Sequence, residues 1–298
     1  MLLEVEPAAD LRYQRRWELL QWTNRQQEVI EGVLLYPLRY DAKRRYPLVV
    51  DPYGFVHAER HAYDEVNIAK ASSKYFIFRP NHRGPHTYVN AIKNAVYDAA
   101  AVGPTGIAVM VDDVLSGVDK LIERGLVDST RMCLAGMSNG ALQGAQILTQ
   151  THRFKCAMLQ SGNYDWISST TFTADPSDSL MFTYQIAPWE DASIHVALSP
   201  VLQAGKIATP ILLAVGDREP LVVQATELYS VLRYLSKEVT FLRYRNEGHG
   251  LTGAAEQDFT QRMEAFFAKY LDGDRQQVSA AHHAEHLNRN GAQPSRAD

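Results

Sequence analysis

The chain has 298 residues, 46% of them hydrophobic and 21% charged, which is ordinary for a globular protein with a sizeable core. Its formal net charge of −4 does not favour the phosphates of nucleic acid, so we expect no nucleic-acid partner. No apolar run is long enough to span a membrane, and the N-terminal residues lack the apolar core of a signal peptide. We therefore expect a cytoplasmic protein with no membrane partner, unless a longer N-terminus carried a secretion signal.

Short apolar runs alternate with helical patterns along most of the chain. We predict strands at Gly32–Tyr36, Leu48–Asp51, Tyr75–Arg79, Met132–Ala135, Lys155–Leu159, Ile211–Val215 and Val239–Tyr244. Several of these runs are continuously apolar, as in parallel strands that helices cover on both faces. We predict helices at Arg60–Ala71, Ile107–Arg124, Asn139–Gln150, Val223–Leu235 and Glu256–Tyr270. Strands alternating with helices indicate an α/β fold built on a mostly parallel, doubly covered sheet.

Three segments need separate comment. The polar face of the helix predicted over 107–124 carries Asp112, Asp113 and Asp119, and we expect water to solvate it. Residues Asn163–Leu198 are aromatic-rich and irregular, and a connection this long in a compact domain is usually a functional loop, such as a pocket wall. The tail over Gly273–Asp298 is polar and poor in large apolar residues, which predicts disorder.

Metal and cofactor sites are not expected. The two cysteines, Cys133 and Cys156, are too few for a disulfide framework or a self-contained zinc site, and on successive predicted strands they are expected to be buried, reduced thiols. Three histidines of the tail have helical spacing, but nothing there would fix the geometry of metal ligands. The sequence also lacks a Gly-rich loop that could cradle a phosphate.

A candidate nucleophile follows the strand predicted at Met132–Ala135. The residues Gly136-Met137-Ser138-Asn139-Gly140 have the pattern G-x-S-x-G and lead directly into a predicted helix. Glycines on both sides of the serine permit a tight strand-to-helix turn that exposes the hydroxyl beside the positive end of a helix. The pattern and its position therefore predict a serine nucleophile at Ser138.

A serine nucleophile needs a base, and the base needs an acid that orients it. His249 lies between two glycines directly after the last predicted strand, where a loop histidine can reach over the edge of a sheet. The acid has two candidates, because Asp217 and Glu219 both follow the strand predicted at Ile211–Val215. Reach and loop geometry decide between the two carboxylates, and the sequence leaves that choice open.

These motifs, together with others along the chain, resemble the hydrolase domain of the prolyl oligopeptidase family of serine peptidases. The resemblance runs from about Glu18 to Leu271 and includes YPLVVDPYG, RPNHRG, VDDVLSGVDKLIERGLVDSTRMCLAGMSNGA, LQSGNYDW and YRNEGHG. It implies an α/β-hydrolase fold with Ser138 as nucleophile and His249 as general base. It also implies that the Tyr53 hydroxyl and the Asn139 N–H stabilise the oxyanion. Aromatic residues of the long loop, among them Trp166, Tyr184 and Trp189, are expected to line the acyl-side pocket.

Two departures from the family pattern matter. The acid loop is about two residues short: counting from the strand puts Glu219 in the acid position, and counting back from the next helix puts Asp217 there. We favour Glu219, because the strand end fixes the start of the loop, and a glutamate also resembles the lasso-peptide isopeptidases of this family. The second departure is that the family's N-terminal β-propeller has no counterpart in the chain, although Arg16–Tyr36 resembles the crossover that leads out of it.

The domain organisation that we expect has three parts. Residues 1–23 are an N-terminal extension or the remnant of a crossover from a missing propeller, residues 24–272 are the catalytic domain, and residues 273–298 are a disordered tail. The expected function is hydrolysis of peptide or isopeptide bonds through an acyl-enzyme. The alternatives are an esterase or thioesterase acting on small acyl esters and, less in keeping with the motifs, a binding module without turnover.

Overall fold

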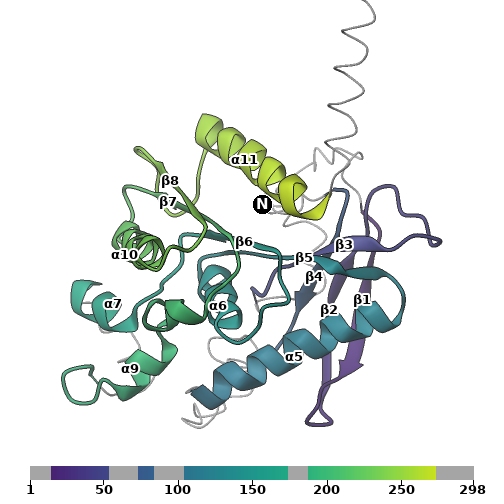
Figure 1. The fold of residues 1–298 in the computed structure, drawn as a ribbon, viewed down its shortest axis with the longest axis horizontal. Helices are drawn as coiled ribbons and strands as arrows, with labels where there is room; N and C mark the ends of the chain where they lie inside the picture. The colour runs from purple at the N-terminus through teal and green to yellow at the C-terminus, as the bar shows by residue number, and fades with distance from the viewer. Residues whose placement is uncertain (1–14, 54–72, 84–103, 174–186, 273–298) are drawn as a thin grey trace, which may run out of the picture.

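The computed structural model describes residues 15–53, 73–83, 104–173 and 187–272, and its centre is a single mixed sheet (Figure 1). The described strands are β1 (Trp17–Thr23), β2 (Val29–Leu35), β3 (Tyr46–Val50), β4 (Phe76–Pro80), β5 (Val127–Met137), β6 (Cys156–Gln160), β7 (Ile211–Gly216) and β8 (Val239–Tyr244). Their order across the sheet is β1-β2-β4-β3-β5-β6-β7-β8. The strands β3 to β8 are mutually parallel, whereas β2 pairs antiparallel with β4 and β1 pairs antiparallel with β2.

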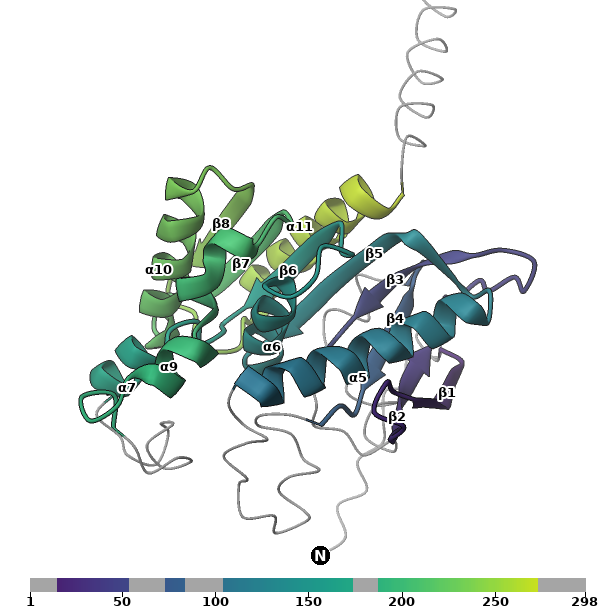
Figure 2. The same cartoon turned by 60° about the horizontal axis from the view of Figure 1, so that its bottom comes forward.

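Helices lie on both faces of this sheet (Figure 2). They are α5 (Pro104–Glu123), α6 (Asn139–Leu148), α7 (Trp166–Thr173), α9 (Ser193–Leu198), α10 (Leu221–Tyr234) and α11 (Gly253–Leu271), with a 3₁₀ helix, η3, over Pro200–Lys206. Among the described helices, α11 covers one face of the sheet, while α5, α6 and α10 cover the other. This doubly covered, mostly parallel sheet is the fold class that the alternation of apolar runs predicted.

The core follows from the period of two along each strand. On β5, Met132 and Leu134 point into the core that contains α5 and α6, whereas Cys133 and Ala135 point toward α11. Every residue of β3 is buried, which explains why the central strands read as continuous apolar runs rather than as alternating ones.

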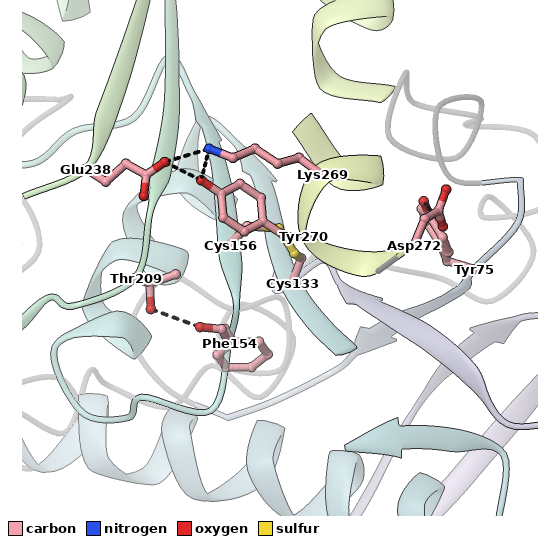
Figure 3. Close-up of a disulfide and its surroundings, with 9 residues drawn as sticks. All are labelled: Tyr75, Cys133, Phe154, Cys156, Thr209, Glu238, Lys269, Tyr270 and Asp272. Carbon is pink, nitrogen blue, oxygen red and sulfur yellow. Dashed lines mark hydrogen bonds and ion pairs between the residues drawn. A yellow bond between two sulfur atoms is a disulfide. The ribbon is translucent and has the colours of Figure 1, made fainter. Parts of the chain in front are cut away.

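The two cysteines correct one expectation. Cys133 and Cys156 are fully buried, stand directly opposite each other on the parallel strands β5 and β6, and form a disulfide with their Cα atoms 4.8 Å apart (Figure 3). The expectation of two reduced thiols was wrong. Each cysteine lies on a strand with apolar neighbours, and only the register of the two strands sets them face to face.

The sequence predicted each of the strands from β2 to β8 and missed β1. The strand β1 pairs with β2 along its whole length, although alternate residues face solvent. All of β1 lies within residues 1–23, which we expected to be an extension or the remnant of a crossover. The helix predicted at Arg60–Ala71 and the tail over Gly273–Asp298 lie outside the described residues. Within the part of the chain that the structure describes, no helix is both long and apolar enough to cross a bilayer.

Candidate active site

Ser138 occupies the sharp turn between β5 and α6. Its backbone has φ 56° and ψ −123°, a left-handed conformation that a side chain adopts only under strain. A Cβ added at Gly136 would lie 2.3 Å from the Gly140 carbonyl oxygen, so the turn has no room for a side chain there. The Ser138 N–H donates to the carbonyl of Gln160 at the end of β6 (2.8 Å), which ties the turn to the neighbouring strand. Gly136 thus has the structural role in the turn that the motif predicted.

Tyr53 lies against this turn, although it comes from the end of β3, far away in the sequence. A Cβ added at Gly140 would stand 3.1 Å from both the Cβ and the Cδ2 atom of Tyr53, so the tyrosine packs on the first turn of α6. Burial, and then the charge of Asp51, raise the pKa of the Tyr53 hydroxyl, which therefore keeps its proton and can donate a hydrogen bond. Asn139 is the first residue of α6, where backbone N–H groups point out of the helix.

His249 and Glu219 form the second part of the site. The Nδ1 atom of His249 lies 2.6 Å from Oε2 of Glu219. The carboxylate is almost fully buried, with 6% of its side chain exposed, whereas 47% of the imidazole side chain is exposed. A buried carboxylate behind a half-exposed imidazole is the arrangement that holds a general base in one tautomer.

The carboxylate also affects the titration of the ring. The hydrogen bond from Nδ1 to Glu219 raises the pKa of His249 above the ordinary value of 6.5, and burial of the imidazole opposes that increase only in part. Among the described residues, neither the Nε2 atom of His249 nor the Oγ atom of Ser138 has a hydrogen-bond partner. The two atoms are therefore not hydrogen-bonded to each other, and a contact between nucleophile and base often tightens only when substrate binds.

Asp217, the alternative acid, has another role. Its Oδ1 atom accepts a hydrogen bond from the backbone N–H of Asn246 (2.7 Å), and its Oδ2 atom lies 3.8 Å from the Arg243 guanidinium. Asn246 has a left-handed backbone with φ 64°, so Asp217 caps the strained turn that leads from β8 toward His249. The structure thus places Glu219, and not Asp217, beside the imidazole.

Close backbone contacts fix the two loops that carry this pair. A Cβ added at Gly216 would lie 2.2 Å from the carbonyl oxygen of Gly248, so the loop after β7 and the loop after β8 touch through their backbones. The N–H of Arg218 donates to the carbonyl of Glu247 (2.9 Å) and reinforces this contact. Because Glu219 and His249 each follow one of these contacts by one to three residues, their side chains have little freedom to separate.

Ser161 is a residue of this site that the sequence analysis missed. It follows β6 directly and is fully buried, and its hydroxyl donates to Oε1 of Glu219 (2.5 Å). The same oxygen lies 3.3 Å from the carbonyl oxygen of His249. The only sequence signal was its position, since it is a polar residue directly after a buried strand at the same sheet edge as Ser138.

Buried charges brace the side of the site that carries Tyr53. The Arg79 Nε atom lies 2.9 Å from Oδ2 of Asp51, with 8% and 3% of the two side chains exposed. The other oxygen of Asp51 accepts the backbone N–H of Tyr53 at 3.2 Å. His82 is fully buried, with its two ring nitrogens near the carbonyls of Pro52 (2.9 Å) and Arg83 (3.0 Å). These contacts hold the backbone on which Tyr53 is mounted.

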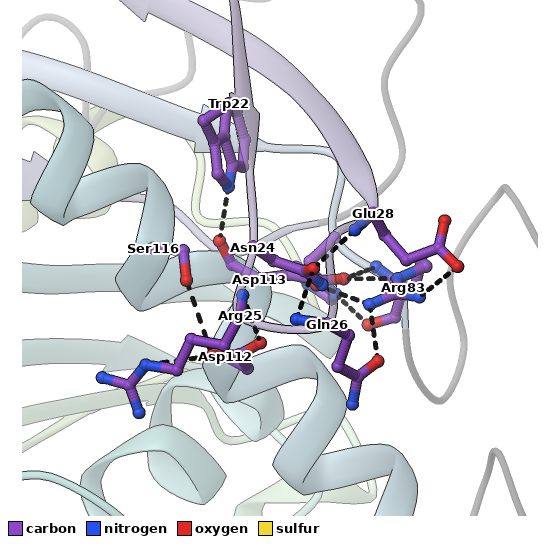
Figure 4. A network of polar contacts seen from close by, with 10 residues as sticks. Trp22, Asn24, Arg25, Gln26, Glu28, Arg83, Asp112, Asp113 and Ser116 are labelled. Carbon is purple, nitrogen blue, oxygen red and sulfur yellow. Dashed lines mark hydrogen bonds and ion pairs between the residues drawn. The ribbon is translucent and has the colours of Figure 1, made fainter.

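A second group of buried polar contacts lies on α5, on the helix face that we expected water to solvate. Asp113, which we expected on a solvated face, is fully buried and accepts hydrogen bonds from the backbone and the guanidinium of Arg83 at 2.8–3.0 Å (Figure 4). Asn24, from the turn after β1, donates to the same carboxylate at 2.6 Å. The helical pattern showed only that Asp113 is polar. Asp113 is buried because Arg83, from the segment after β4, packs over its carboxylate.

The aromatic residues expected in the pocket have separate environments. Trp166 begins α7 and is 7% exposed within the main core, whereas Trp189 is 68% exposed in the turn before α9. Tyr184 lies outside the described residues. A substrate-binding role for these side chains thus stays a prediction. In the part of the chain that the structure describes, no group of three or more His, Cys, Asp or Glu residues is arranged to hold a metal ion.

Similar proteins agree with this architecture. A model of the prolyl oligopeptidase family matches residues 65–274. The chain is 29% identical over 242 residues to the uncharacterized peptidase YuxL of Bacillus subtilis, which covers 79% of this chain and 36% of that protein. It is also 29% identical over 134 residues to the lasso peptide isopeptidase AtxE2 of Asticcacaulis excentricus, covering 44% of this chain and 19% of that one.

Solved structures share the fold at low sequence identity. An acylaminoacyl peptidase of Pyrococcus horikoshii matches with a TM-score of 0.68 and 20% identity, covering 87% of this chain and 42% of that one. The AtxE2 isopeptidase matches with a TM-score of 0.68 and 20% identity, covering 95% of this chain and 45% of that one. The chain thus spans about a third of the length of YuxL and less than half of these two structures. Since the family match extends over more than half of its residues, this chain belongs to the prolyl oligopeptidase family of serine peptidases and has the α/β-hydrolase fold.

Proposed function

We propose that the chain hydrolyses peptide or isopeptide bonds through an acyl-enzyme, with Ser138 as nucleophile, His249 as general base and Glu219 as the acid that orients the base. The observation that carries the proposal is the 2.6 Å contact between Glu219 and Nδ1 of a half-exposed imidazole. That contact leaves Nε2 as the atom that can exchange a proton with a nucleophile at the same sheet edge.

The proposed reaction proceeds in two halves. Ser138 Oγ attacks the scissile carbonyl carbon while His249 Nε2 takes its proton, and the imidazolium then protonates the leaving amine. Water, deprotonated by the same imidazole, hydrolyses the acyl-enzyme and regenerates the serine. The Asn139 N–H and the Tyr53 hydroxyl donate to the oxyanion in both halves, and each such donor typically contributes about 3 kcal/mol to transition-state stabilisation.

The position of Glu219 also bears on the substrate. A glutamate in the acid position resembles the lasso-peptide isopeptidases, and the AtxE2 isopeptidase is among the relatives of this chain. We therefore propose ring-closed peptides with an isopeptide bond as one substrate class beside linear peptides. An esterase differs only in its leaving group, which the Ser–His–Glu chemistry does not discriminate.

One experiment tests both the chemistry and the substrate class. Reaction of the purified chain with a fluorophosphonate probe should label Ser138, and Ser138→Ala should abolish the labelling, with Ser236→Ala as a matched control. The same protein is then given peptide p-nitroanilides, a ring-closed isopeptide and nitrophenyl esters. Labelling that survives in Ser138→Ala would refute the proposed nucleophile. Hydrolysis of the esters alone would identify an esterase instead.

A further inference from the structure

Ser161 lies at the junction between the two halves of the candidate site. It is the residue after Gln160, whose carbonyl accepts the N–H of Ser138, and its own N–H donates to the carbonyl of Ala214 on β7 (2.9 Å). Its side chain reaches in the other direction, to Oε1 of Glu219. One short segment at the end of β6 thus contacts the nucleophile turn, the central sheet and the candidate acid.

The two oxygens of Glu219 have different partners. Oε2 faces His249 Nδ1 at 2.6 Å, and Oε1 accepts the Ser161 hydroxyl at 2.5 Å, which is the short range of a hydrogen bond to a charged oxygen. The hydroxyl has a single hydrogen, so the 3.3 Å contact with the His249 carbonyl is at most a shared, weaker bond. Glutamate has one more rotatable bond than aspartate, and an anchored Oε1 removes the freedom that this bond would give to the carboxylate.

We propose that Ser161 is a positioning residue, whose hydroxyl holds the Glu219 carboxylate so that Oε2 faces His249 Nδ1. The proposal rests on the function proposed above, in which Glu219 orients the base. Ser161 touches neither the substrate nor a reacting atom in this scheme. Its removal should therefore slow the chemical step without weakening substrate binding.

A second explanation for a serine at this position is its backbone. Ser161 has φ 52°, and a small polar residue could be present only because it tolerates this left-handed conformation. Glycine separates the two explanations, because it relieves the backbone strain and also removes the hydroxyl. Ser236 supplies a matched control, since it has φ 55° in an exposed turn after α10, remote from Glu219.

The test compares Ser161→Ala and Ser161→Gly with Ser236→Ala in the full chain. We expect kcat on a peptide p-nitroanilide to fall about 10- to 100-fold in both Ser161 variants, with KM within about twofold of the parent value. The rise of kcat/KM with pH should move to lower pH, because a loosened Glu219 no longer holds the pKa of His249 above its ordinary value. Ser236→Ala should match the parent protein in each measurement.

The outcomes that overturn the proposal are distinct from failure of the proposed function. A kcat that stays normal in Ser161→Gly, or a pH profile that does not move down, would assign Ser161 a backbone role only. Titration of the His249 ring by NMR gives a readout without turnover. If the parent protein shows no hydrolysis, a lower His249 midpoint in Ser161→Gly still supports the positioning role, and an unchanged midpoint refutes it. Should Ser161→Ala fail to fold, Ser161→Gly carries the test alone.

Discussion

The two sides of the candidate site use carboxylates in different ways. On the tyrosine side, which comprises Asp51, Tyr53 and Arg79, the carboxylate is paired with a permanent cation, and both charges are buried. On the imidazole side, which comprises Ser161, Glu219 and His249, the carboxylate is equally buried but its partner is a half-exposed imidazole. One pair can only support structure, whereas the other contains a group that gains and loses a proton near neutral pH.

This difference suggests distinct roles: the Asp51–Arg79 pair supports the structure, whereas the Glu219–His249 pair is suited to proton transfer. Asp51 and Arg79 each lose their charge partner if the other is removed, so their effect should appear in stability. In the proposed function, Glu219 acts through the orientation and basicity of His249, so its effect should appear in rate and pH dependence. The four predictions below test this division, and they run from the largest expected effect to the smallest.

The largest effect is expected for the acid. Glu219→Gln should lower kcat about 10³- to 10⁴-fold, because an amide behind the imidazole no longer favours the productive tautomer or stabilises the imidazolium. Asp217→Asn is the matched control, since Asp217 caps the Asn246 turn and does not contact the imidazole. Its kcat should stay within about tenfold of the parent value. The reverse result, a large loss in Asp217→Asn and none in Glu219→Gln, would exchange the two roles.

Among these variants, loss of the ion pair between Arg79 and Asp51 should have the largest effect on stability. Arg79→Met leaves Asp51 charged and buried without its cation, which should cost about 3–5 kcal/mol in the free energy of unfolding. Urea denaturation followed by circular dichroism measures this change. Arg262→Met removes an exposed ion pair with Asp258 and should leave the denaturation midpoint nearly unchanged. Equal midpoints for the two variants would contradict the assignment of Arg79 as a brace.

Tyr53→Phe tests whether the tyrosine side also takes part in the reaction. The ring still packs against Gly140, but the hydroxyl is lost, and we expect kcat to fall about 100-fold with little change in stability. Tyr40→Phe, at a partly buried tyrosine in an aromatic cluster on Tyr36 and Phe76, controls for loss of a hydroxyl elsewhere. An unchanged kcat in Tyr53→Phe would make the tyrosine a packing residue alone.

The smallest expected effect is a shift in the midpoint of kcat/KM against pH. Because Glu219 raises the pKa of His249, kcat/KM should increase with pH to a midpoint above 6.5, and Glu219→Gln should lower that midpoint. The sign for stability is the opposite: the pairing stabilises the fold fully below pH 6.5, and this contribution is lost as the pH rises through the raised pKa. Rate measurements and urea midpoints across the neutral range check both signs.

Local patterns in the sequence predicted most of the sheet and the strand-to-helix turn at Ser138. The strands β3 and β7 read as uninterrupted apolar runs because helices or loops bury all their residues. The turn at Ser138 needs glycine at position 136 because a Cβ there would clash with the carbonyl oxygen of Gly140. Such features depend on neighbours in the chain, and a single sequence displays them directly.

Polar contacts between distant segments were harder to predict. Asp113 has the helical position of a solvated residue, but Arg83 and Asn24 converge on it from other elements. The pairing of Cys133 with Cys156 depends on the register of two strands. The strand β1 exposes alternate residues at the sheet edge, so it lacks the continuous apolar run by which the central strands were found.

The sequence alone determined the alternation of strands and helices, the glycine-flanked serine turn and a histidine loop after the last strand, since each rests on residues close together in the chain. Only the tertiary structure placed one of the two candidate carboxylates, Glu219, beside the imidazole of His249. These two carboxylates are separated by one residue. Which of them faces His249 depends on how the loops after β7 and β8, which touch at Gly216 and Gly248, pack against each other. Side-chain direction in a loop is set by the segments that pack against it, and those segments are far away in the sequence.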